Sequence, residues 1–187
     1  MNAIAAKSPA IQLRLQQASL GFRLAAVLVG TAILALSSYI EVPMIPVPMT
    51  MQTFAVTLIG AAYGWRLGAA TVAAWLLEGA VGLPVLAGGA AGLPYFAGWT
   101  AGYLISFPFA AALVGWLAER GWNGSRPLLA FAAMLAGNAF TLALGGAWLA
   151  VLAGPEKAVM LGVAPFVIGG IVKSALGAAT MRAFVRA

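Results

Sequence analysis

The sequence predicts an all-α membrane protein, a single bundle of six transmembrane helices with both termini in the cytoplasm. Apolar residues make up 63% of the chain and charged residues only 7%, whereas soluble domains carry about 25% charged residues. The apolar runs are continuous and approach the ~20 residues that cross a hydrocarbon core, so they indicate helices and not barrel strands. The positive charges stand singly at the ends of these runs, which is typical of topology signals and not of nucleic-acid binding.

The spans follow one another without a visible domain boundary, so residues 1–187 are expected to form one integral-membrane domain in the cell (inner) membrane. A cytoplasmic tail of residues 1–23 comes first, because it lacks the apolar core of a signal peptide. The spans are expected at about 24–40, 50–63, 67–82, 99–117, 127–152 and 163–184.

The break between the second and third spans falls at Gly64, Trp65 and Arg66. The alternative is one span across 53–79 with Arg66 at its centre, which costs about 2.5–3.5 kcal/mol even on a lenient insertion scale. Two spans also leave only Lys157 on the external side, in agreement with the preference of basic residues for the cytoplasm. The predicted cytoplasmic residues are Lys7, Arg14, Arg23, Arg66, Arg120, Arg126, Arg182 and Arg186.

Two apolar but irregular stretches lie on the external side. Residues 41–54 contain three prolines within six positions, which excludes a helix there. Residues 80–98 contain five glycines and two prolines and no charge. Such backbone is tolerated near membrane depth only where it is buried in protein or lines a cavity. The two stretches together predict a roofed pocket open to the outside, although the first could also be a mere connector between helices.

Polar side chains inside the spans are the candidate binding residues. Glu78 and Lys173 are the ionisable ones, and such groups are costly in a membrane unless they have a function. Either they pair with each other, or Lys173 points into a pocket and meets an anionic or carbonyl-bearing ligand. Neutral hydrogen-bonding groups could come from Tyr103, Gln52, Thr50 and Asn138, and Trp99 and Trp75 are the tryptophans best placed to line a pocket.

Several kinds of chemistry are excluded by residue type. The chain has no cysteine, histidine or aspartate, so it offers no thiol nucleophile, no histidine-assisted serine and no metal-ligand set. No glycine-rich phosphate loop follows a strand. We therefore expect no cofactor, no enzymatic activity and no ATP binding by this chain itself.

Small residues four apart in the first span form a smooth face on one side of a helix. Ala26 and Gly30 are such a pair. This spacing lets another helix approach closely, either within the bundle or from a partner protein.

Four strings of residues identify a family. They are IPVPMTMQTFAV (45–56), GLPVLAGGAAGL (82–93), GWTAGYL (98–104) and APFVIGGIVKSAL (164–176). With them the chain resembles the BioY family, the biotin-specific substrate-binding subunits (S-components) of energy-coupling factor transporters, over about residues 24–184. The resemblance implies a six-helix subunit that captures biotin from outside and works with a transmembrane coupling protein and ATPase subunits. It also implies that Ala26 and Gly30 dock on the coupling protein.

Two departures from the family pattern concern the expected site. The last helix of the family commonly carries an acidic residue three positions before its lysine; here that position is Gly170, while Lys173 is kept. Trp99 stands where the family usually has proline, and Tyr103 is kept. The missing acid keeps open a ligand other than biotin, such as another vitamin or a biotin precursor. A membrane-embedded enzyme or a structural protein is the remaining alternative.

Overall fold

The computed structural model describes residue 15 and residues 17–186. Lys7, Arg14 and most of the predicted tail lie outside the described residues. In the part of the chain that is described, four helical stretches are long and apolar enough to cross a bilayer: Leu20–Ser38, Ala101–Glu119, Pro127–Ala153 and Pro155–Val185. The chain is therefore a predominantly helical, multi-pass membrane protein, as its composition predicts.

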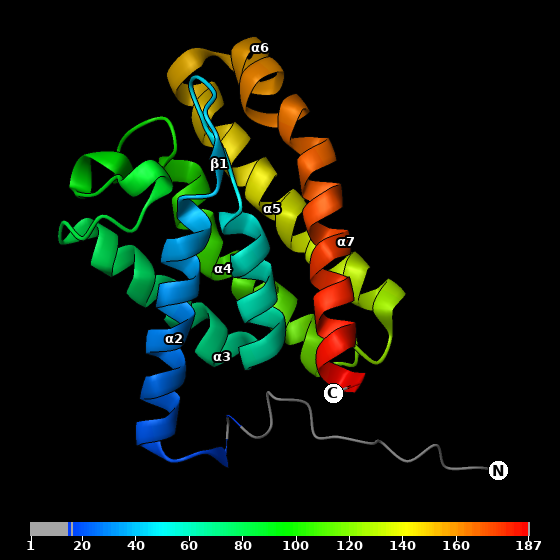
Figure 1. Cartoon of the computed structure of the whole chain (residues 1–187). Helices are drawn as coiled ribbons and strands as arrows, with labels where there is room; N and C mark the ends of the chain where they lie inside the picture. The colour runs from blue at the N-terminus through cyan, green and yellow to red at the C-terminus, as the bar shows by residue number, and fades with distance from the viewer. Residues whose placement is uncertain (1–14, 16, 187) are drawn as a thin grey trace.

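These stretches are built from helices α2 (Leu20–Ser38), α4 (Ala101–Glu119) and α5 (Pro127–Ala153), followed by α6, η3 and α7 (Figure 1). Helix α6 (Pro155–Lys157) continues through a π-helical turn, η3 (Ala158–Val163), into α7 (Ala164–Arg186). The last helical stretch thus begins eight residues earlier than the predicted span at 163. Gly154 ends α5 with φ 88°, which sets the sharp turn into α6.

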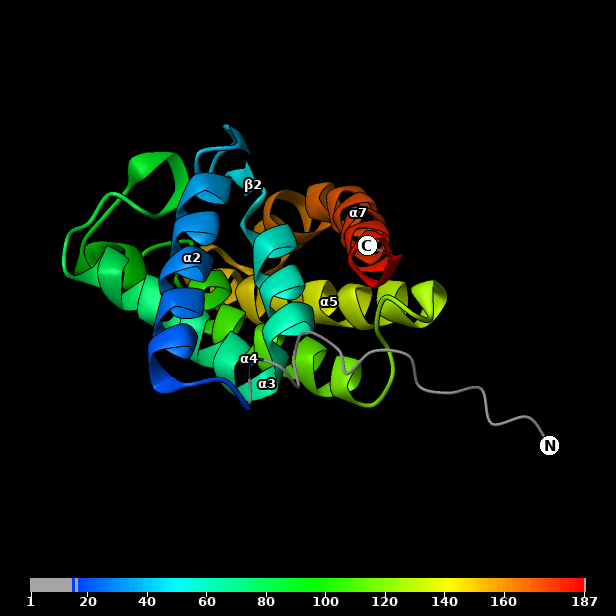
Figure 2. The same ribbon diagram turned by 60° about the horizontal axis from the view of Figure 1, so that its bottom comes forward.

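Helix α3 (Gln52–Ala80) is bent into two arms at Gly64, whose φ of 81° and ψ of 172° are not helical. The arms, residues 52–63 and 65–80, run in clearly different directions in both views (Figures 1 and 2). A Cβ on Gly115 of α4 would lie 2.5 Å from the Trp65 nitrogen, so α4 passes directly against the bend. The predicted break in this region is confirmed, and it falls at the glycine.

The proline-rich stretch forms a β-hairpin. Strand β1 (Glu41–Val42) pairs antiparallel with β2 (Met49–Thr50), with Glu41 opposite Thr50 and Val42 opposite Met49. The three prolines lie outside the paired residues, where their missing N–H groups break no ladder hydrogen bond. An otherwise all-α fold thus contains one small sheet, which the sequence pattern did not predict.

The second irregular stretch, residues 81–98, folds back over the helices with two short 3-10 turns, η1 (Ala87–Gly89) and η2 (Leu93–Phe96). Buried Trp75 holds it by donating from Nε1 to the Val85 carbonyl at 2.9 Å. The backbone N–H of Gly92 donates to the Gly79 carbonyl at 2.8 Å, and the Tyr39 hydroxyl donates to the Pro84 carbonyl. We call residues 81–98 the cover segment.

Candidate functional site

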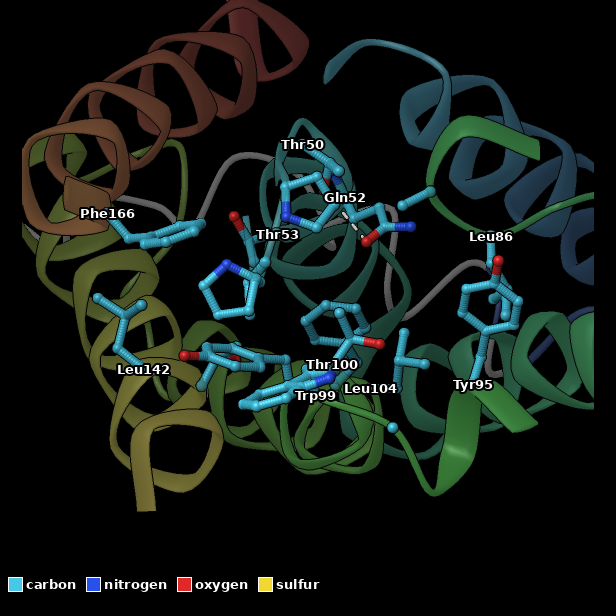
Figure 3. Close-up of a pocket in the computed structure, with 18 of the residues that line it drawn as sticks. Thr50, Gln52, Thr53, Leu86, Tyr95, Trp99, Thr100, Leu104, Leu142 and Phe166 are labelled. Atoms are coloured by element: carbon cyan, nitrogen blue, oxygen red, sulfur yellow. Dashed lines mark hydrogen bonds between the residues drawn. The ribbon is translucent and has the colours of Figure 1, made fainter. Parts of the chain in front are cut away.

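A cavity of about 470 Å³ lies between the hairpin, the cover segment and helices α3, α4, α5 and α7 (Figure 3). This volume is in the range of small-molecule sites. Both irregular stretches contribute to its wall, the first with Pro46 and Pro48 and the second with Pro94 and Tyr95. The prediction that these stretches roof a pocket agrees with this arrangement.

Most of the wall is apolar. Phe107 of α4 and Phe166 of α7 are buried, and Leu86 of the cover segment is 1% exposed. The rings of Tyr103 and Phe166 meet with centroids 6.4 Å apart and a 31° tilt. Such a wall favours a ligand with a compact apolar ring system.

Lys173 places the one ammonium group among the residues that line this cavity. It is 9% exposed, and its Nζ donates to the Thr50 carbonyl at 2.6 Å and the Thr53 hydroxyl at 3.3 Å. Both partners are neutral, and an ammonium has three N–H donors. One donor therefore remains for a ligand, and the charge is not neutralised by these contacts.

Thr50 and Gln52 form a connected group at the base of the hairpin. The Thr50 hydroxyl donates to Gln52 Oε1 at 3.1 Å and accepts from the Gln52 backbone N–H at 3.2 Å. Gln52 Nε2 donates to the Ser38 hydroxyl of α2 at 3.0 Å. These bonds fix the hairpin to α2 and orient both side chains at the edge of the cavity (Figure 3).

Tyr103 and Asn138 also line the cavity, and both are buried. The Tyr103 hydroxyl donates to the Gly162 carbonyl at 2.7 Å. A Cβ on Gly145 would lie 2.1 Å from the Tyr103 ring, so only glycine leaves room for the ring against α5. Asn138 Nδ2 donates to the Met134 carbonyl and to the Ser174 hydroxyl, at 3.0 and 3.1 Å.

Gly170 faces the same cavity. A Cβ built there meets only the Asn138 Cβ, at 3.7 Å, which is an ordinary contact distance. The position where the family resemblance leads us to expect an acidic side chain is therefore open space beside Asn138.

The structure brings six of the seven proposed binding residues to this cavity: Thr50, Gln52, Trp99, Tyr103, Asn138 and Lys173. Glu78 does not line it; Glu78 lies in the last turns of α3, and the hydrogen-bond partners of Lys173 are threonines. Trp75 is also absent from the wall. It is fully buried and stacks on Phe107 with centroids 6.1 Å apart, so it supports the wall from behind.

The proposed docking pair, Ala26 and Gly30, faces into the bundle. A Cβ on Gly30 would lie 2.5 Å from Thr71 Cγ2, and the Ala26 carbonyl accepts a hydrogen bond from the Tyr63 hydroxyl at 2.9 Å. This face of α2 is therefore filled by α3, in agreement with the internal-packing interpretation. Gly30 is buried in this conformation, and docking of a coupling protein on Ala26 and Gly30 stays a prediction.

Phe107, Thr141 and Phe166 are among the wall residues that the sequence pattern did not single out. Helical spacing could have found them. Phe107 follows Tyr103 by four positions, Thr141 follows Asn138 by three, and Phe166 precedes Lys173 by seven. Residues at these spacings share a helix face.

An apolar helical bundle around a cavity with a few polar groups is the architecture of a membrane-embedded protein that binds a small molecule. The chain belongs to the BioY family, whose family model matches residues 11–187. Among curated relatives, the biotin transporter BioY of Thermotoga maritima is 36% identical over 48% of this chain and 53% of its own length. That of Rhizobium etli is 38% identical over 59% of this chain and 62% of its own length. The alignments thus span just over half of these two relatives.

A third relative, the biotin transporter BioY2 of Lactococcus lactis subsp. cremoris, is 31% identical over 68% of this chain and 69% of its own length. Among solved structures, the S-component for biotin from an ECF-type ABC transporter superposes with a TM-score of 0.76. It covers 91% of this chain and 95% of that chain at 23% identity. The fold is therefore that of an S-component.

Proposed function

We propose that this protein is the biotin-binding subunit of an energy-coupling factor transporter, which captures biotin from outside the cell for ATP-driven uptake. The observation that carries the proposal is the mostly apolar cavity with the buried amine of Lys173 in its wall. Biotin combines an apolar sulfur-containing bicycle with a ureido group and a carboxylate. The aromatic wall suits the bicycle, and the free N–H of Lys173 suits an oxygen of either polar group.

The proposed topology has six spans with both termini in the cytoplasm of a cell (inner) membrane. Support comes from Trp–Arg pairs at one end of the bundle. Arg66 lies over the Trp65 ring at 4.9 Å, and Arg120 lies over the Trp116 ring at 3.6 Å. Tryptophan and arginine together are typical of the cytoplasmic membrane interface. The hairpin lies at the opposite end of the bundle from the C-terminus (Figure 1).

The proposed partners are a transmembrane coupling protein and ATPase subunits, because this chain has no phosphate-binding loop of its own. The subunit itself is proposed to be non-enzymatic. Its working step is binding under the two irregular stretches, followed by release to the inside when the bundle or the stretches rearrange.

A second candidate ligand is a related vitamin or a biotin precursor. The open space at Gly170 favours it, because an acidic ligand contact expected from the family is missing there. Competition binding to the purified chain separates the two candidates. Unlabelled biotin is expected to displace labelled biotin completely and more strongly than desthiobiotin. Stronger displacement by desthiobiotin would favour the precursor, and no specific binding of biotin would contradict the proposed function.

A further inference from the structure

Two buried polar groups on the inner face of α5 have hydrogen-bonding capacity that the protein does not use. Both N–H groups of Asn138 are occupied, by the Met134 carbonyl and the Ser174 hydroxyl. Its Oδ1 has no hydrogen-bond partner among the described residues, although the side chain is only 4% exposed. These two hydrogen bonds fix the orientation of the Asn138 amide and leave its Oδ1 available to accept a hydrogen bond.

Thr141, one turn further along α5, is in the same situation. It is 2% exposed, and its hydroxyl has no partner in the part of the chain that is described. Other buried helical threonines bond their own helix: Thr57 donates to the Thr53 carbonyl at 3.0 Å and Thr71 to the Leu67 carbonyl at 2.8 Å. The Thr141 hydroxyl does not make this usual hydrogen bond to a carbonyl of its own helix.

Both free groups adjoin the cavity. Among the described residues, every side-chain nitrogen or oxygen that is fully shut off from solvent has a partner, so Asn138 Oδ1 and the Thr141 hydroxyl keep accessible surface. Both residues line the cavity, as does Gly170, whose missing side chain leaves Asn138 uncovered. A ligand N–H that leaves water on entering the cavity needs an acceptor, and these two oxygens can supply one.

We infer that Asn138 and Thr141 form the acceptor edge of the site and receive the N–H groups of the ligand, in place of the carboxylate that is absent at position 170. The inference rests on the proposed function, since the ureido ring of biotin supplies two such N–H groups. Recognition through neutral acceptors on α5 makes α5, and not α7 alone, a determinant of specificity. Lys173 supplies a donor from α7, so donor and acceptors come from different helices.

The test measures the dissociation constants of biotin and of biotin methylated on its ureido nitrogens, for the chain in lipid nanodiscs. The wild-type chain is expected to bind the methylated ligand at least ~10-fold more weakly than biotin, because a lost hydrogen bond leaves a buried acceptor unpaired. In Asn138→Leu, biotin affinity is expected to fall about tenfold. The penalty for methylation is expected to shrink below about threefold in the same variant, because the N–H has no acceptor left to lose.

Thr141→Val is nearly isosteric and keeps the test valid if Asn138→Leu does not fold. In Thr141→Val, the ratio of the dissociation constants of methylated biotin and biotin is expected to fall by about threefold or more relative to wild type. Thr71→Val is the matched control, since Thr71 is equally buried but bonds its own helix away from the cavity. It should leave both dissociation constants within about twofold of wild type.

Equal weakening of biotin and its methylated form in both cavity variants would overturn the inference, because it would indicate a packing role. Unchanged affinities in both variants would overturn it as well. If wild-type protein binds no biotin, the proposed function fails at the first measurement. If wild-type protein binds biotin and both variants still discriminate against methylated biotin as strongly as wild type, the inference about α5 fails. The proposed function then still stands.

Discussion

Lys173 is the residue whose position says most about the site. A lysine in the middle of an apolar helix is costly unless its ammonium finds partners. Here it reaches the start of α3, where the Thr50 carbonyl and Thr53 hydroxyl hold it at the cavity wall. The amine is thereby kept among neutral groups, with hydrogen-bonding capacity left for a ligand.

Replacing Lys173 by methionine is expected to weaken biotin binding at least tenfold, about 1.4 kcal/mol, because a charge-assisted hydrogen bond is lost while the apolar stem remains. Lys157→Met is the control, since Lys157 is exposed on α6. Equilibrium binding of labelled biotin measures both variants. Equal affinity of Lys173→Met and wild type would remove this lysine from the site.

Gly170→Asp is expected to be tolerated and to raise biotin affinity several-fold. Its Cβ meets only the Asn138 Cβ at 3.7 Å, and a carboxylate there is three residues from Lys173 on the same helix face. A charged acceptor binds an N–H more strongly than a neutral one. Gly170→Ala fills the same space without an acceptor and should give no gain. Loss of binding in Gly170→Asp, or an equal gain in Gly170→Ala, would contradict this explanation.

At the scale of elements, the bend of α3 was predictable, but the hairpin was not. The break at Gly64 follows from a glycine two residues before an arginine in an otherwise apolar run. The hairpin depends on pairing Glu41 with Thr50, and the prolines between them indicate only that a helix is excluded. The local sequence therefore predicts where the chain turns. It does not predict which strand pairs with which, because that pairing depends on the tertiary structure.

The inward orientation of Gly30 was not predictable for a related reason. Helix α2 is apolar on all sides, with Leu28 and Leu36 exposed, so hydrophobic periodicity does not indicate which face meets α3. Asn138 and Lys173 were predictable as cavity residues because polar groups in apolar helices stand out. Thr141 was not, because threonine is common in such helices and its free hydroxyl is visible only in three dimensions.

Gly64→Ala is expected to destabilise the fold by about 1–3 kcal/mol, because φ 81° with ψ 172° is accessible almost only to glycine. The change should lower the midpoint of thermal unfolding in detergent. Gly21→Ala is the control: Gly21 is in α2, and a Cβ there meets nothing within 4 Å. That variant should unfold at or slightly above the wild-type temperature. An unchanged midpoint for Gly64→Ala would show that the bend relaxes freely.

At the scale of the whole molecule, the chain combines an S-component fold with a cavity roofed by two irregular stretches. The superposition on the biotin S-component, with TM-score 0.76 over 91% of this chain, extends across the bundle and not only the cavity. The cover segment and the hairpin both attach to α2, through Tyr39 and through Ser38. The C-terminal end of α2 is thus an attachment point for both stretches.

The proposed topology makes a prediction about accessibility from the two sides of the membrane. The chain has no cysteine, so single cysteines can be introduced without removing others. In right-side-out vesicles, a membrane-impermeant maleimide should label Glu156→Cys directly and Ser125→Cys only after lysis, because the two exposed residues lie at opposite ends of α5. Labelling of both sites without lysis, or the reverse pattern, would contradict the six-span arrangement.

The isolated chain is predicted to bind biotin in the cavity beneath the hairpin and the cover segment. Calorimetric titration of the purified chain in nanodiscs measures this most directly. We predict saturable binding of one biotin per chain, with Lys157→Met behaving as wild type and Lys173→Met at least tenfold weaker. Absence of saturable binding, or equal affinity in Lys173→Met and wild type, would contradict the account.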